Sequence, residues 1–274
     1  MIVDPAQRTS RARQLWRAAR MSLHLLRGLA ITTLLFPLTA AAGRRTHIRR
    51  WSAQLLALLA IEARVEGTLA GAAGNVVFAC NHVSWLDIFV LDALMPARFI
   101  AKSELAHWPL IGRLVRDTGT IFLERARRAD MMRVNALATA ALSHGDCLAV
   151  FPEGTTTDGT TLLKFHGSLL QPVIDARGHV QPVALRYTYA DGTQSLAPEY
   201  AGDTSFIESF WRVCGVRAHV VAIVALPPID AQQRSRRELA SMAEEAVRRA
   251  LARQAPAAPA TAPGTSAACR DRPQ

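Results

Sequence analysis

Short apolar runs rich in β-branched residues alternate with helix-like segments through the middle of the chain. The run 75–80 is typical of a buried strand, and a helical pattern over 84–94 follows it. Further strands are predicted at 99–101, 120–123, 147–151, 180–187 and 216–226, and further helices at 110–117, 130–143 and 234–254. This alternation predicts an α/β fold with a mainly parallel sheet flanked by helices. We expect the last strand to be antiparallel or at an edge.

The N-terminal part has a different composition. The net charge is +10, yet the first fifty residues hold ten arginines and a single acid, Asp4. Residues 28–43 contain no charged side chain, and Arg44, Arg45, Arg49 and Arg50 follow them. Because basic clusters beside an apolar helix are attracted to anionic lipid, we predict that residues 1–66 form a helical membrane-anchoring hairpin. A single span, which needs about 20 apolar residues, and an ordinary buried helix pair are the alternatives.

The remaining chain divides into two parts. Residues 67–254 are predicted to form the α/β domain, because half of the 274 residues are apolar and can supply one packed core. The Ala- and Pro-rich tail 255–274 is predicted to be disordered. The cysteines at 80, 147, 214 and 269 are widely spaced and form no C-x-x-C pair. We therefore expect the thiols to be reduced, and we expect no metal site. Nucleic-acid binding would rest on net charge alone and is not expected.

His82 and Asp87 lie at a predicted strand-to-helix junction, and residues 152–155 follow another strand. Sites in parallel sheets lie at the carboxyl ends of strands, so both segments are expected at one edge. A carboxylate one turn into the helix could fix the histidine tautomer and leave the other nitrogen to take a proton from an alcohol. The same spacing also fits a helix cap with a surface histidine and aspartate.

The chemistry expected at this junction does not use a protein nucleophile. No G-x-S-x-G elbow exists, and Ser84 lies too close along the chain to be an obvious partner of His82. The base is therefore expected to act on a substrate hydroxyl. Backbone amides of residues 82–84 are natural donors for an oxyanion.

Several sequence blocks, in this order, resemble the glycerolipid (PlsC-like) acyltransferase family, whose bacterial type member acylates lysophosphatidic acid. The blocks are N-H-x-x-x-x-D at 81–87, K-S-E-L at 102–105 with W-P and G at 108, 109 and 112, G-T-I-F-L-E-R at 119–125, F-P-E-G-T at 151–155 and Q-P-V-A at 181–184. The likeness covers residues 75–190, with a helical segment ahead of it.

The resemblance implies acyl transfer from acyl-CoA or acyl carrier protein to the free hydroxyl of 1-acylglycerol-3-phosphate, giving phosphatidic acid. It implies no acyl-enzyme and no cofactor, and it implies membrane lipids as partners at the cytoplasmic face of the inner membrane. His82 is then the general base, and Asp87 orients it. The residues implied in substrate binding are Arg125 and Lys102 for the phosphate, and Glu153, Gly154 and Thr155 for the acceptor site.

Departures from the family pattern leave the acceptor open. Glu124 precedes Arg125, T-T-D-G follows Thr155, and K-F-H-G at 164–167 replaces the more usual Pro-Phe-Lys. A lyso-ornithine lipid, which offers a hydroxyl but no phosphate, is therefore an alternative acceptor. A non-catalytic lipid-binding protein of the same fold is the other alternative, and the intact His82, Asp87 and Glu153 argue against it.

Overall fold

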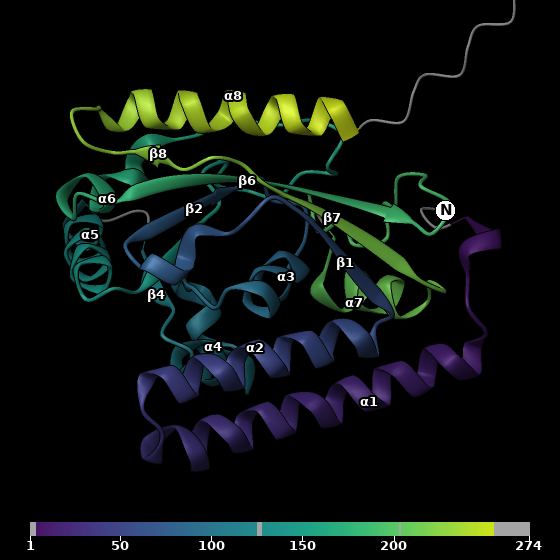
Figure 1. Cartoon of the computed structure of the whole chain (residues 1–274). Helices are drawn as coiled ribbons and strands as arrows, with labels where there is room; N and C mark the ends of the chain where they lie inside the picture. The colour runs from purple at the N-terminus through teal and green to yellow at the C-terminus, as the bar shows by residue number, and fades with distance from the viewer. Residues whose placement is uncertain (1–3, 125–127, 203, 255–274) are drawn as a thin grey trace, which may run out of the picture.

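The computed structural model describes residues 4–124, 128–202 and 204–254, and these form one eight-stranded sheet covered by helices (Figure 1). The strands lie in the order β1-β7-β6-β2-β5-β3-β4, and β8 pairs with β6. Their bounds are β1 Ile61–Glu66, β2 Val76–Cys80, β3 Arg98–Lys102, β4 Ile121–Leu123, β5 Cys147–Val150, β6 His179–Tyr189, β7 His219–Ala225 and β8 Ile229–Asp230. Among the described strands, the β6–β7 and β6–β8 pairs are antiparallel and the other pairs are parallel. The predicted mainly parallel sheet is confirmed.

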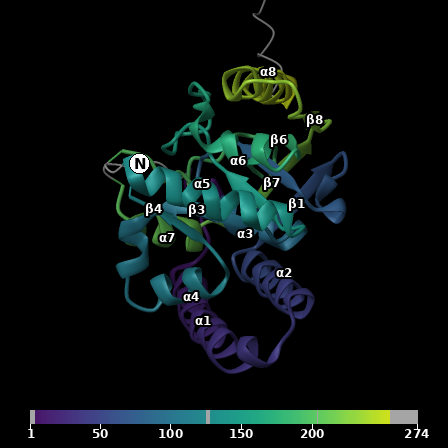
Figure 2. The same cartoon turned by 90° about the vertical axis from the view of Figure 1, so that its left-hand side faces the viewer.

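The helices divide between the two faces of the sheet. Their bounds are α1 Arg11–Ala30, α2 Ala41–Leu58, α3 Leu86–Leu94, α4 Ile111–Asp117, α5 Arg128–Ser143, α6 Gln171–Asp175, α7 Phe206–Cys214 and α8 Arg236–Gln254. Figures 1 and 2 show α8 on one side of the sheet and the α1–α2 pair with α3 and α4 on the other. Two separate apolar clusters, one on each face, form the core.

Strand β2 contributes to both clusters. Val76, Phe78 and Cys80 pack with the cluster of α1, α2 and α3, whereas Val77 and Ala79 pack with that of α5 and α8. All five residues are buried. A strand with helices on both faces has no solvent side, which explains why this segment is a continuous apolar run rather than an alternating one.

The N-terminal helices form the predicted hairpin, and one tryptophan fastens it. Helix α1 continues through short helical turns at Ile31–Leu35 and Phe36–Leu38 before α2 runs back beside it. The Trp51 indole stacks on His24 with ring centroids 4.6 Å apart, and its Nε1 donates to the His24 carbonyl at 3.1 Å. A Cβ at Gly28 would lie 2.8 Å from the same indole nitrogen, so close packing requires glycine there. Trp51 also contacts Phe89 of α3, at 5.6 Å between centroids, which joins the hairpin to the sheet domain.

The outward side of the hairpin exposes large leucines, and Arg11, Arg13, Arg20 and Arg27 of α1 are exposed beside them. Leu23, Leu26, Leu34 and Leu38 expose 68%, 53%, 65% and 87% of their surface. The segment Arg11–Leu38 is long and apolar enough to cross a membrane, judged by length and composition. Arg17 holds the N-terminal half of α1 to the sheet domain, because its guanidinium donates to the carbonyls of Val216 and Arg217.

One secondary-structure prediction was wrong. The segment 61–66, predicted as the end of the helical anchor, is strand β1 and pairs in parallel with β7. Its alternation of Ile61, Ala63 and Val65 with charged residues is a strand pattern, although it directly continues a long helical segment. Strand β7 is antiparallel to β6, which confirms the expectation that this strand is antiparallel or at an edge, and β1 pairs with its other side. The tail 255–274 lies outside the described residues.

Candidate functional site

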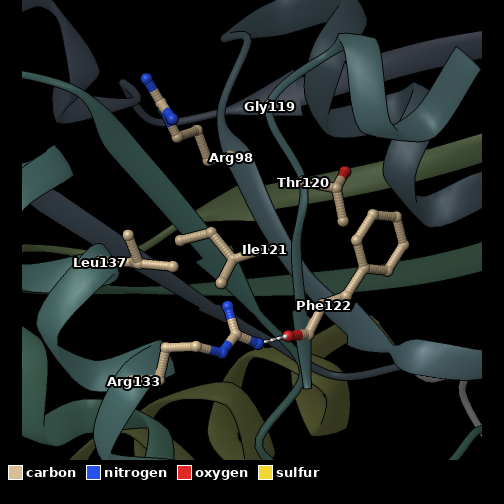
Figure 3. A pocket seen from close by; sticks show the side chains of 7 residues that line it. All are labelled: Arg98, Gly119, Thr120, Ile121, Phe122, Arg133 and Leu137. Carbon is tan, nitrogen blue, oxygen red and sulfur yellow. Dashed lines mark hydrogen bonds between the residues drawn. The ribbon is translucent and has the colours of Figure 1, made fainter. Parts of the chain in front are cut away.

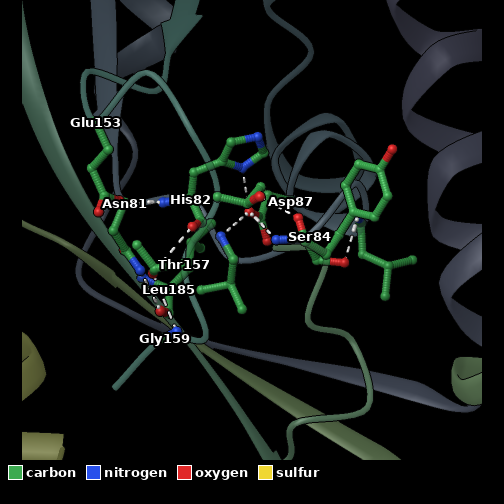
Figure 4. Close-up of polar contacts among 12 residues, drawn as sticks. Asn81, His82, Ser84, Asp87, Glu153, Thr157, Gly159 and Leu185 are labelled. Carbon is green, nitrogen blue, oxygen red and sulfur yellow. Dashed lines mark hydrogen bonds and ion pairs between the residues drawn. The ribbon is translucent and has the colours of Figure 1, made fainter. Parts of the chain in front are cut away.

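His82 and Asp87 meet where β2 ends and α3 begins. Asp87 lies in the first turn of α3, and its Oδ2 is 2.8 Å from the Nδ1 atom of His82 (Figure 4). The contact predicted from the spacing of the two residues is therefore present. Because a carboxylate accepts hydrogen bonds and cannot donate them, Nδ1 carries the proton of the neutral ring and the lone pair lies on Nε2. The ring can then act as a base through Nε2.

The Asp87 carboxylate is fully buried and surrounded by donors. Its Oδ2 also accepts from the backbone amides of Val83 at 2.8 Å and Ser84 at 2.9 Å, and its Oδ1 accepts from the Tyr187 hydroxyl at 2.8 Å. Two of these contacts cap the start of α3, where free N–H groups favour an anion. Asp87 is thus an ionised acceptor fixed in orientation.

The same contacts correct one expectation about the oxyanion site. The amides of Val83 and Ser84 donate to Asp87, and the amide of His82 donates to Glu153 Oε1 at 2.7 Å. All three amides of residues 82–84 are therefore engaged inside the protein, and the prediction that they bind an oxyanion is wrong. Local spacing could not reveal the Glu153 contact, which joins residues 71 positions apart, whereas the Asp87 contacts with the Val83 and Ser84 amides, four and three positions away, are those of a helix cap, which the spacing also fits.

Contacts from the segment after β5 fix the position of His82. The Phe151 ring stacks on the imidazole, with centroids 3.8 Å apart and an angle of 11° between the planes. The Thr157 amide donates to the His82 carbonyl at 2.9 Å. With the Glu153 contact, these interactions hold both the backbone and the ring of His82.

Glu153, Gly154 and Thr155 have different surroundings. Glu153 is buried, and its second oxygen accepts from the Leu163 amide at 2.9 Å, so its contacts hold the backbone of the site. Burial raises the pKa of this carboxyl, although the two backbone donors oppose the shift. Gly154 has a φ of 75°, a conformation that favours glycine, and Thr155 is exposed. Gly154 and Thr155 line the same cavity as His82.

That cavity has a volume of about 590 Å³ and is mostly apolar. It lies between the hairpin, α3, α4, α7 and the segment after β5, and it reaches His82. The apolar side chains that define it include Met21, Leu25, Phe36, Trp85, Phe89, Trp108, Phe206 and Phe210. A chamber of this size and character suits an aliphatic chain.

The described charged residues that line the cavity are few. Lys102, at the end of β3, and Glu104 are exposed, whereas Asp92 of α3 is buried. Burial raises the pKa of Asp92 to about 8, with a hydrogen bond from the Ala97 amide acting against it. Arg125, the other predicted phosphate ligand, lies outside the described residues.

Sequence reasoning missed Tyr187 and the helix α7. Val183, Leu185 and Tyr187 alternate along β6 and pack with the hairpin-side cluster, so the period of two placed Tyr187 on the inner face. Its contact with Asp87 depends on strand order, which local spacing does not give. Helix α7 adds Phe206 and Phe210 to the cavity wall.

The other pocket and the buried cysteine beside the site are poor candidates for a reactive group. A pocket of about 280 Å³ at the β4 edge is lined by Arg98 and Arg133 (Figure 3), but Arg98 is 2.8 Å from Asp146 and Arg133 is 2.7 Å from Asp130. Cys80 is buried, which raises the pKa of its thiol well above the usual value and disfavours a nucleophilic thiolate. In the described part of the chain, no three His, Cys, Asp or Glu side chains group to hold a metal.

Comparison with known proteins identifies the family of this chain. The family model described as acyltransferase matches residues 62–186. The lyso-ornithine lipid O-acyltransferase of Pseudomonas aeruginosa is 38% identical over 208 residues, which cover 76% of this chain and 79% of that protein. The 1-acyl-sn-glycerol-3-phosphate acyltransferase of Neisseria gonorrhoeae is 36% identical over 179 residues, 65% of this chain and 70% of that protein.

The fold has a counterpart among solved structures. The crystal structure of the 1-acyl-sn-glycerophosphate acyltransferase PlsC from Thermotoga maritima has a TM-score of 0.60 at 22% identity, and the match covers 86% of this chain and 97% of that one. At this identity the likeness shows the fold. Together with the family match and the two relatives, it shows that the chain belongs to the PlsC-like acyltransferase family and is an O-acyltransferase.

Proposed function

We propose that the protein transfers a fatty acyl group from an acyl thioester to the free hydroxyl of a lyso-lipid, with His82 as general base and Asp87 as the residue that orients it. The observation that carries the proposal is the His82–Asp87 hydrogen bond of 2.8 Å beside an apolar cavity of about 590 Å³. A base positioned in this way contributes a factor of about 10² to 10⁴ to the rate of a proton-transfer-assisted reaction.

The reaction proceeds by direct attack. His82 Nε2 takes the hydroxyl proton while the oxygen bonds to the thioester carbonyl carbon, forming a tetrahedral oxyanion. The oxyanion collapses, the carbon–sulfur bond breaks, and the imidazolium returns the proton to the leaving thiolate. Ser84 supports the absence of an acyl-enzyme, because it is fully buried and its hydroxyl accepts from the Leu86 amide at 3.3 Å.

The acceptor that we propose first is 1-acylglycerol-3-phosphate, which would give phosphatidic acid, with acyl-CoA or acyl carrier protein as donor. Lys102 supports it, since an exposed ammonium beside the cavity can pair with a phosphate. The name of the Neisseria relative points to the same acceptor. Arg125 would add the second cation that a phosphate monoester requires.

A lyso-ornithine lipid is the second candidate, and a specific observation favours it. Among the described residues of the cavity, the exposed Lys102 is accompanied by the exposed acid Glu104, a pair that suits a headgroup carrying both an amine and a carboxylate. Thr156, which follows the F-P-E-G-T segment, donates its hydroxyl to the Tyr200 carbonyl and offers no charge for a phosphate. The Pseudomonas relative is named for this acceptor.

We also propose that the enzyme works at the cytoplasmic face of the inner membrane. The exposed leucines of α1 and the arginines at 44, 45, 49 and 50 support this, because an apolar face beside basic residues binds anionic lipid surfaces. The acceptor would then enter from the lipid layer and the donor from water.

The test is thiol release from acyl-CoA by the purified full-length protein in mixed micelles, with each acceptor in turn. Wild type should release CoA only when an acceptor is present, and His82→Ala should lower kcat at least a hundredfold. His179→Ala, an exposed histidine at the start of β6, is the matched control and should retain full activity. Equal rates for wild type and His82→Ala would exclude the proposal and favour a non-catalytic lipid-binding protein.

The acceptor is decided in the same assay by Lys102→Ala. If the natural acceptor is the phosphate monoester, this change should raise its KM about tenfold and leave the KM of acyl-CoA unaltered. If lyso-ornithine lipid is preferred, wild type should use it faster than lysophosphatidic acid.

A further inference from the structure

One contact to Asp87 comes from a distant strand. The Tyr187 hydroxyl donates to Asp87 Oδ1 at 2.8 Å, across a sequence separation of 100 residues. Tyr187 exposes 2% of its surface and Asp87 none. The proposed mechanism uses His82 and Asp87 only, so this phenol has no assigned role in it.

The fold brings Tyr187 to this place through Asn81. The Asn81 side chain donates to the Leu185 carbonyl at 2.9 Å and accepts from the Leu185 amide at 2.7 Å, which fastens β6 beside the segment that follows β2 (Figure 4). Two residues further along β6, the Tyr187 side chain is on the same face as Leu185. The strand therefore carries the phenol to the junction where His82 and Asp87 lie.

The two oxygens of Asp87 have distinct partners. Oδ2 faces His82 and the amides of Val83 and Ser84, whereas the contact to Oδ1 comes from Tyr187. Burial and the nearby Asp87 carboxylate raise the pKa of Tyr187 well above its usual value. The phenol thus keeps its proton and remains a donor at every working pH.

We propose that Tyr187 is a positioning residue for acyl transfer, fixing the Asp87 carboxylate so that Oδ2 faces His82 and reducing the negative charge that the imidazole meets. The proposal rests on the function proposed above. The titratable groups around Asp87 are His82, Tyr187, Cys80 of β2 and Glu153 of the segment after β5. Cys80 is a neutral thiol, and Glu153 is the same in wild type and in a Tyr187 variant. Neither group therefore explains a difference in pH dependence between the two proteins.

The proposal predicts a pH effect with a definite sign. Tyr187→Phe removes a donor from the carboxylate, which then presents more charge to the Nδ1–H of His82 and favours the protonated ring. The base is therefore available only at higher pH. The ascending limb of kcat/KM against pH should move up by about half to one pH unit.

The experiment compares Tyr187→Phe with Tyr189→Phe in the full-length protein. Tyr189 is two residues further along β6 and buried, but it packs in a separate cluster with Ala197 and Val216. Tyr187→Phe should lower kcat about tenfold at pH 7, leave the KM of acyl-CoA unchanged and move the ascending limb. Tyr189→Phe should have the wild-type pH profile.

The pH profile separates positioning from a structural effect. A variant that is partly unfolded has fewer active molecules and a lower kcat, yet the active molecules keep the wild-type ascending limb. A fall in kcat without movement of the limb, or wild-type values throughout, would overturn the role of Tyr187. Loss of the difference between wild type and His82→Ala would instead overturn the proposed function, so the two failures are distinguishable.

Discussion

Helices α1 and α8 have nearly equal lengths, 20 and 19 residues, but opposite relations to the protein. Helix α8 buries Leu239, Ala240, Ala243, Val247 and Ala250 against the sheet and turns its charged residues outward. Helix α1 buries Arg17 and His24 together with Met21 and Gly28, whereas Leu15, Trp16, Leu23 and Leu26 are exposed. Helix α8 follows the pattern of a surface helix in water, whereas α1 exposes large apolar side chains beside Arg11, Arg13, Arg20 and Arg27. The difference supports the proposal that α1 contacts an apolar phase outside the protein.

The largest expected effect is on the binding of the α1 segment to lipid. In a protein carrying Leu23→Glu, Leu26→Glu and Leu34→Glu together, binding to vesicles that contain anionic lipid should fall about a thousandfold or more, because each leucine that is buried in lipid contributes about 1.5–3 kcal/mol. Sedimentation with vesicles measures this. The melting temperature should stay unchanged, since the three leucines are exposed. Met242→Glu on α8, also exposed, is the control, and sedimentation of the triple variant like wild type would refute a lipid-contacting α1 face.

The reverse change on α8 should affect folding instead. Ala243 is fully buried, so Ala243→Asp places an unpaired carboxylate in the core and should lower the free energy of unfolding by about 3 kcal/mol or more. Urea unfolding followed by circular dichroism measures it. If this variant were as stable as wild type, α8 would not pack as described.

Arg17 makes the buried polar contact of α1 with the sheet domain. Arg17→Met leaves the carbonyls of Val216 and Arg217 without this donor and should cost about 2 kcal/mol of unfolding free energy. Arg13→Met, an exposed position one turn earlier, should change stability by less than about 0.5 kcal/mol. Equal effects of the two changes would mean that α1 is not fastened through Arg17.

The smallest effect concerns the buried acid in the cavity beneath the hairpin. Because the folded protein raises the pKa of Asp92 from 3.8 to about 8, folding takes up a proton between these values. The stability contributed by that proton is complete below about pH 4 and is lost as the pH rises through 8. Asp92→Asn should therefore make the decline in unfolding free energy between pH 7 and pH 8 shallower by about 1 kcal/mol. The exposed Asp175→Asn should leave the wild-type slope, and a wild-type slope in Asp92→Asn would contradict the prediction.

Most of the sheet could be predicted because its strands are local patterns. The runs that became β2, β5 and β6 are too apolar and too rich in β-branched residues to be surface segments. Strand β1 was missed because its alternation directly continues a long helical segment. Helix α7 was missed because it is short and follows an irregular stretch.

The site could be predicted only where its contacts are local. His82 and Asp87 are five residues apart at a helix start, so their spacing already favoured a contact. The contacts of Asp87 with Tyr187 and of the His82 amide with Glu153 join residues 100 and 71 positions apart. Such contacts depend on strand order and register, which no local pattern specifies, so the engagement of the His82 amide could not be predicted. The contacts of the Val83 and Ser84 amides with Asp87 are local, and a helix cap predicts them.

The stacking of Phe151 on His82 restricts how a substrate can reach the base. With the phenyl ring nearly parallel to the imidazole and the ring centroids 3.8 Å apart, one face of the imidazole is shielded, and in the proposed mechanism an incoming alcohol must approach along the ring edge that carries Nε2. Recognition of the acceptor is thereby divided: the aromatic wall dictates the trajectory of the hydroxyl, while groups farther along the chamber distinguish one headgroup from another. An enzyme of this kind can acquire a different lipid acceptor during evolution while the residues that transfer the proton stay the same.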